Sequence, residues 1–191
     1  VATATANADA ASMSHTVKVS NVATNAYIQT GDSGISRESD ASSAKSIYLK
    51  DLIASGDSSY TEDKKNNVAL SFSVGDGTTT KEISFTYADI YESNQTLNDL
   101  ATKIKNSGVN IQATYDSVND SFSLYQKTGG DANKIELTVT DRSADETKDG
   151  TTYDQKSDDR ARTLLNHLNL YQVETNTDAT THETTQSLTS L

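Results

Sequence analysis

The chain has 191 residues, of which 34% are hydrophobic, and 27 acidic against 16 basic residues give it a formal net charge of −11. Acidic charge without clustered Lys and Arg argues against nucleic acid and anionic membranes as partners. The lack of Cys excludes a disulfide framework, a thiol nucleophile and a cysteine-based zinc site. No apolar run approaches the roughly 20 residues that span a bilayer, and we expect no cleavable signal peptide at the start.

Polar stretches divide the chain. Residues 29–43, 54–67 and 141–158 are rich in Ser, Thr, Asp and Asn and are predicted to form exposed loops, and the tail after Val173 has a similar composition. Ahead of these stretches, residues 17–19 consist of a lysine with one valine on each side. This alternation predicts a short strand.

Apolar residues then repeat with a period of two in residues 68–74 and again in residues 83–87. A period of two places these side chains on one face of a strand. Gly75-Asp76-Gly77 lies between the two segments, and glycine adopts the positive φ of a tight turn without steric cost. Residues 68–87 are therefore predicted to form a β-hairpin.

The period changes to that of a helix in residues 96–108. The apolar stripe of this helix consists of Leu97, Leu100, Ala101 and Ile104. Thr96 is the predicted N-cap, and Asp99 completes a capping pattern three residues later. Gly108 is placed to end the helix with a left-handed cap.

Alternation resumes beyond this helix and predicts strands at 109–115, 122–124 and 135–139, which we expect to form a three-stranded meander. A second helix is predicted at 158–169. Its stripe consists of Ala161, Leu164, Leu165 and Leu168. The fold class that follows is α+β: a mostly antiparallel sheet with one short helix packed on it in residues 68–139, plus a smaller β-rich flanking layer.

This pattern also predicts how the chain divides. Residues 51–170 are predicted to form an α+β sub-domain, and residues 1–50 together with 171–191 a flanking β-rich sub-domain. The residues that we expect to be most deeply buried are Leu70, Phe72, Phe85, Leu97, Leu100, Ile104, Ile111, Leu124 and Leu137.

The sequence predicts no catalytic residue, no cofactor and no metal site. His15, His167 and His182 have none of the spacings of metal ligands. The nearest approach to a calcium-binding loop, residues 145–150, lacks the acidic residue at its third position and has Lys156 where the closing Glu belongs. We therefore expect a protein without enzymatic activity.

Residues 96–140 resemble the IN motif of flagellins and hook-associated proteins, in which a capped short helix is followed by a Gly-Val strand, a second strand, a Thr-Gly turn and a final strand. The residues that match the motif are Thr96, Leu97, Leu100, Ile104, Gly108, Val109, Ala113, Leu124, Thr128, Gly129 and Ile135. Lys105 departs from it, because the family usually has Asn there, and Asp131 replaces the common Ala. Residues 1–24 resemble the entry into the head of filament cap proteins, with an Ala/Thr/Ser-rich lead before a short alternating strand.

The order of these two stretches is that of the flagellar filament cap (hook-associated protein 2) family, which the chain resembles. The resemblance implies a structural head at the distal, extracellular tip of the bacterial flagellum, exported by the flagellar type III route without a cleaved signal. Its implied partners are flagellin, whose assembly it assists, and other copies of itself in a ring. The long helices of the family's legs are not in this sequence, so we expect the chain alone to be monomeric or weakly self-associating.

Two other interpretations stay open. The first is an adhesin-like tip domain that binds host glycans or mucin, with loop tyrosines such as Tyr60 and Tyr153 as contacts. The chain is also compatible with a variable domain of flagellin itself, which the sequence flanking the chain would distinguish.

Overall fold

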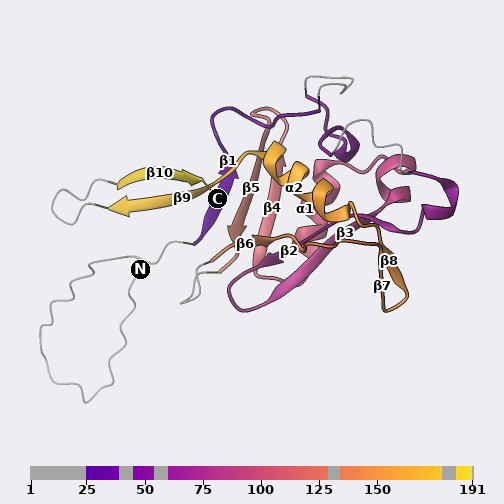
Figure 1. Ribbon diagram of the computed structural model, residues 1–191. Helices are drawn as coiled ribbons and strands as arrows, with labels where there is room; N and C mark the ends of the chain where they lie inside the picture. The colour runs from indigo at the N-terminus through magenta and orange to yellow at the C-terminus, as the bar shows by residue number, and fades with distance from the viewer. Residues whose placement is uncertain (1–24, 39–44, 54–59, 129–133, 178–183, 191) are drawn as a thin grey trace, which may run out of the picture.

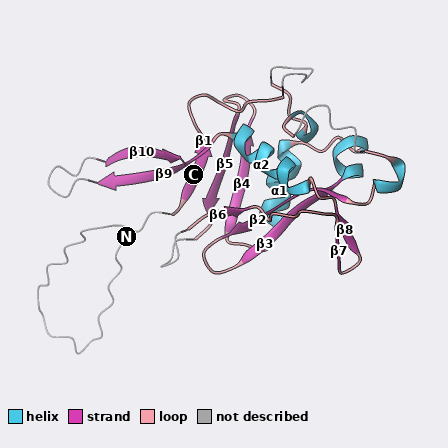
Figure 2. Ribbon diagram, viewed as in Figure 1, coloured by secondary structure: helices cyan, strands magenta, loops and turns pink. Residues whose placement is uncertain are grey.

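The computed structural model describes these residues: 25–38, 45–53, 60–128, 134–177 and 184–190 (Figure 1). Side chains are described as far as Val173. The predicted strand at 17–19 lies outside this part. Two sheets and a few short helices make up the described residues, which confirms the predicted α+β class (Figure 2).

The first sheet is antiparallel and has the strand order β10-β9-β1-β5-β4. Its strands are β1 (Tyr27–Thr30), β4 (Ile111–Asp116), β5 (Ser121–Gln126), β9 (Leu170–Thr177) and β10 (Thr184–Ser190). In β1, Ile28 lies opposite Leu124 of β5 on one side and Gln172 of β9 on the other. The described residues after Val173 therefore form paired strands, in line with the β-rich character predicted for residues 171–191. The threonines of this segment favour strands, although its polar composition masks that preference.

The second sheet has the order β3-β2-β8-β7, and β6 also pairs with β2. Its strands are β2 (Val68–Gly75), β3 (Thr80–Thr86), β6 (Glu136–Thr138), β7 (Glu146–Lys148) and β8 (Thr151–Tyr153). The predicted hairpin is confirmed: Phe72 lies opposite Ile83, and Leu70 lies opposite Phe85. Of the two turn glycines, Gly77 has the positive φ (+87°).

The predicted three-stranded meander is wrong. β1 occupies the edge of β5 that a third strand would need, so β6 crosses to the second sheet and places Leu137 opposite Val74 of β2. Leu137 is consequently half-buried at the border of the core and not deeply buried. The predicted loop at 141–158 is also corrected, because it contains the β7–β8 hairpin. Its turn, Asp149-Gly150, has two positive φ angles (+51° and +78°), as a mirror-image hairpin turn requires.

Both predicted helices are confirmed as α1 (Leu97–Asn106) and α2 (Ser157–Leu168). α1 packs against β4 of the first sheet, and α2 packs against β2 of the second. Three short helical segments connect other elements. They are Leu49–Asp51, Glu62–Lys64 and Ala88–Glu92, the last of which is a π-helix.

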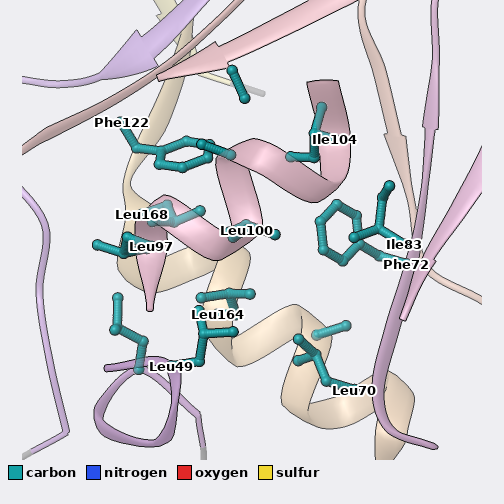
Figure 3. Close-up of a cluster of buried hydrophobic side chains, with 14 of the residues drawn as sticks. Leu49, Leu70, Phe72, Ile83, Leu97, Leu100, Ile104, Phe122, Leu164 and Leu168 are labelled. Carbon is teal, nitrogen blue, oxygen red and sulfur yellow. The ribbon is translucent and has the colours of Figure 1, made fainter. Parts of the chain in front are cut away.

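The core lies between the two sheets and around both helices. Figure 3 shows Leu100 and Ile104 of α1 between Phe122 of the first sheet and Phe72 and Ile83 of the second. The side chains predicted to be most deeply buried are at most 2% exposed, with the exception of Leu137. Those that are confirmed are Leu70, Phe72, Phe85, Leu97, Leu100, Ile104, Ile111 and Leu124. Burial of each such side chain stabilises the fold by about 1.5–3 kcal/mol.

The same hydrophobic cluster extends into the region predicted as a flanking sub-domain. Ile28 of β1 and Leu49 belong to one cluster with Leu70 and Leu100. The division of the chain into two sub-domains stays a prediction about the full chain, including its residues outside the described part.

Candidate functional site

The capping box that marks the start of the predicted motif is formed. The Thr96 hydroxyl accepts a hydrogen bond from the backbone N–H of Asp99 (3.3 Å), and the Asp99 carboxylate accepts one from the backbone N–H of Thr96 (2.7 Å). These reciprocal bonds satisfy donors that the first helical turn leaves free. At the other end, α1 stops at Asn106, and Gly108 has a φ of +90°, which favours glycine.

Most residues that match the motif lie in the core. Six of them are at most 3% exposed: Leu97, Leu100, Ile104, Val109, Ala113 and Leu124. Ile135 is half-buried and Thr128 is exposed, whereas Gly129 lies outside the described residues. A partner cannot contact side chains that are buried in this way. The apolar residues of the motif therefore build the fold, and a partner can reach only its exposed members, such as Gly108 and Thr128.

A polar groove of about 450 Å³ opens at one end of the first sheet, where β1 leaves the sheet beside the β4–β5 turn. It is lined by Tyr27, Gln29, Thr30, Gly31, Asp32, Gly34, Asp116, Asn119, Asp120, Ser121 and Ser123. Hydroxyl, amide and carboxylate groups dominate this lining. The groove thus offers hydrogen bonds to a polar ligand, and the carboxylates of Asp32 and Asp116 disfavour an anionic one.

Asp120, one of the lining residues of this groove, forms an ion pair with Arg37. The Arg37 guanidinium donates two hydrogen bonds to the Asp120 carboxylate, at 2.6 and 2.7 Å, and the Tyr115 hydroxyl donates a third at 2.9 Å. The hydrogen bond from Arg37 holds the pKa of Asp120 below its usual range. Asp120 itself has a φ of +53°. The segment after β1 and the β4–β5 turn are therefore joined by a charged contact whose residues sequence analysis placed in loops.

Tyr60, named above for the glycan alternative, is held by the protein's own side chains. Its ring stacks on Tyr91 with 5.5 Å between ring centroids and lies 6.0 Å from Tyr87. Its hydroxyl donates a hydrogen bond to Glu92, and this bond raises the pKa of Tyr60 to about 12. Tyr60 is thus part of a tyrosine cluster that supports the edge of the core.

Tyr153, the second tyrosine of that alternative, is engaged in the same way. Its hydroxyl donates to a carboxylate oxygen of Glu82 at 2.7 Å, which raises the pKa of Tyr153 to about 12. The Arg142 guanidinium lies 4.4 Å from the centre of its ring. Arg142 also donates to Asp158 at 2.5 Å and to Glu146 at 2.9 Å. This network connects the β7–β8 hairpin to α2.

Arg160 of α2 is a fully buried charge that sequence analysis did not predict. Its guanidinium donates to the backbone oxygen of Ala69 (2.9 Å), to the hydroxyl of Tyr87 (2.8 Å) and to the Asp154 carboxylate (3.3 Å). A signal was available in the sequence: Arg160 precedes Leu164 by four residues and so falls on the apolar stripe of the helix. The network fastens α2 to the second sheet.

His167, the histidine within the described residues, contacts groups of the protein through both of its ring nitrogens. The His167 ring contacts the backbone oxygen of Leu52 through Nδ1 (3.1 Å) and lies 3.6 Å from the Glu38 carboxylate through Nε2. His15 and His182 lie outside the described residues. Within the described part of the chain, no group of three or more His, Cys, Asp and Glu side chains is arranged to hold a metal ion.

Comparisons of the chain with protein-family models, with curated proteins and with solved structures gave no match. The resemblance to the filament cap family therefore depends on the residues of the motif and of the entry segment alone. No helix in the described part of the chain has the length and apolar character needed to cross a membrane.

Proposed function

We propose that this chain is the structural head of a flagellar filament cap protein, located outside the cell at the distal tip of the filament. The observation that carries the proposal is the folded motif: the capped α1, the positive-φ Gly108 and the β4–β5 hairpin follow one another in the order expected for the family. Their apolar residues form the centre of the core, as a motif that specifies a fold requires.

In this proposal the head acts through its surface. No residue has a catalytic role, and no cofactor is involved. The partners of the head are flagellin, whose assembly beneath the cap it assists, and other copies of itself. The contact surface lies among exposed polar elements, because the apolar side chains of α1, β4 and β5 that match the motif are buried. The polar groove beside Asp120 is one such surface, and the ion pair of Asp120 with Arg37 joins two of the segments that line or adjoin it. Export follows the flagellar type III route, which uses no cleaved signal.

Immunogold electron microscopy with antibodies raised against this chain tests the location. We expect gold particles only at the free ends of filaments. Gold along the whole filament would instead support the alternative of a flagellin variable domain, and unlabelled filaments would contradict both. Deletion of the coding region provides a second measurement, for which we expect short or absent filaments and unpolymerised flagellin in the medium.

The glycan-binding alternative is less well supported by the geometry. The hydroxyls of Tyr60 and Tyr153 already donate to Glu92 and Glu82. Replacing either tyrosine would disturb an internal contact, so loss of binding in such a variant would not identify a glycan site. A binding test of this alternative needs variants in the polar groove, such as Asp32→Ala, whose exposed side chain lines it.

A further inference from the structure

The β9–β10 hairpin extends from the rest of the described residues (Figures 1 and 2), and among them no strand pairs with the outer edge of β10. β10 is the last strand in the order of the first sheet. On the other side of the hairpin, the pairing of β1 with β9 covers Leu170 to Gln172. Within the described residues, the remainder of β9 therefore pairs with β10 alone. A two-stranded ribbon of this kind is marginally stable in water and gains stability from a further strand.

The other sheet edges carry features that oppose strand pairing. At the β3 edge, the Lys103 ammonium donates to the backbone oxygen of Ser84, and the Asp89 carboxylate accepts from the backbone N–H of Thr86 (2.9 Å). β7 and β4 contain charged residues, Glu146 and Lys148 in β7 and Asp116 in β4. Charged side chains on an edge strand are a common protection against association.

β10 has no such protection. Its sequence, TTQSLTS, contains no charged residue and no proline, in a chain with 27 acidic and 16 basic residues. Copies with a net charge of −11 repel one another, and this repulsion is weakest where they meet at an uncharged strand. Threonine also favours strands, and Thr–Thr pairs across neighbouring strands are stabilising.

The strand is close to self-complementary in the antiparallel direction. Centred on Ser187, two copies would align Thr185 with Thr189, Gln186 with Leu188 and Thr184 with Ser190. A contact of one strand with the same strand of a second copy is isologous, and it closes as a dimer. The hairpin extends away from the other described elements, so its outer strand is the part of the first sheet that lies farthest from the helices (Figure 1).

We propose that β10 pairs antiparallel with β10 of a second copy of this chain, joining two five-stranded sheets across a twofold axis. This contact is independent of the capping proposal and holds whatever the partner of the head is. A single pair of strands buries far less than the roughly 1,200 Å² of a typical specific interface. The dimer is therefore weak in dilute solution and forms at high local concentration.

Disulfide trapping tests the contact with the whole chain. The chain has no cysteine, so a single introduced thiol cross-links only between copies. The Ser187→Cys variant places the two thiols at the proposed axis. Thr147→Cys is the matched control, because it lies in the middle of β7, an edge strand with charged neighbours. Thr185→Cys tests the register, since its two thiols would lie two residues to either side of the axis.

We expect Ser187→Cys to form covalent dimers about tenfold faster than Thr147→Cys under mild oxidation, because a pre-formed contact raises the effective concentration of the thiols. Adding Gln186→Lys to Ser187→Cys is expected to remove this advantage. If the Thr185→Cys variant formed dimers faster than Ser187→Cys, the β10–β10 pairing would be supported, with the twofold axis at another residue. Equal rates for the three single variants would overturn the proposal, and this is also the result expected if another segment of the same chain covered β10.

Hydrogen exchange of the unmodified chain gives a readout that needs no variant. We expect the protection of alternate β10 amides to rise with protein concentration, because alternate N–H groups of an edge strand point away from β9. The β7 amides provide the internal reference and are expected to stay unchanged. Exchange in β10 that does not depend on concentration up to the millimolar range would also overturn the proposal.

Discussion

Replacement of Arg160 by Ala removes the charge that balances a buried carboxylate. Arg160 is 0% exposed and Asp154 is 3% exposed, so the truncation removes the buried cation beside Asp154 and leaves it the half-buried Lys64 ammonium at 3.9 Å. Breaking a buried pair in this way costs about 3–5 kcal/mol. The control is Arg162→Ala on the same helix, because the Arg162 side chain is 41% exposed and pairs with exposed Asp141 and Asp159. Such surface pairs contribute about 0–1 kcal/mol.

Urea denaturation followed by circular dichroism at pH 7 measures both variants. A loss of this size for Arg160→Ala lowers the midpoint by about 1–3 M, given the usual dependence of unfolding free energy on urea. Asp154→Asn combined with Arg160→Met separates charge from packing, since it removes both charges and keeps much of the volume. We expect the double variant to be more stable than Arg160→Ala. Equal midpoints for Arg160→Ala and Arg162→Ala would refute the reasoning that the buried network fastens α2.

Other predictions concern single positions. Ile104→Asp places an unpaired charge at a site that is 1% exposed and should lower the stability of the protein by several kcal/mol. Lys105→Asn changes an exposed site and should alter stability by less than about 0.5 kcal/mol. Thermal melts in which Lys105→Asn is the more damaging change would contradict the helix register. Gly108→Ala should cost about 1–2 kcal/mol because of its φ of +90°, and an unchanged melting temperature would contradict that cause. Asp76 accepts hydrogen bonds from backbone N–H groups, that of Asn110 foremost, which lowers its pKa. Its stabilising contribution is therefore complete above the unfolded pKa of about 3.9 and is lost as the pH falls through the lower folded value, so Asp76→Asn should destabilise the protein more at pH 7 than at pH 2.

Elements with strong apolar periodicity could be predicted from the sequence. The β2–β3 hairpin and both α-helices follow patterns that few alternatives share, and local capping at Thr96 fixed where α1 begins. These signals depend on neighbours within one turn or one hairpin. These elements could therefore be predicted without knowing which distant segments they contact.

The missed elements depend on distant or polar partners. Periodicity assigns β6 to a place beside β5, but that place is taken by β1, a four-residue strand more than 90 residues earlier in the chain. The β7–β8 hairpin has no apolar face, because its strands are mostly exposed. The burial of Arg160 was not predicted, since it depends on acceptors supplied by Tyr87 and Asp154. The polar groove likewise consists of residues that only the paired strands bring together.

The position of β1 in the middle of the first sheet has a consequence for how the chain folds. The Thr30 hydroxyl donates to the backbone oxygen of Leu168 at 2.9 Å, a contact between residues separated by 138 positions. A high proportion of such long-range contacts slows folding, because the entropy of loop closure is lost before the contacts form. A chain that emerges N-terminus first cannot complete this sheet until β9 has also emerged. The first sheet is therefore expected to form only after β9 has emerged, as a late and cooperative event.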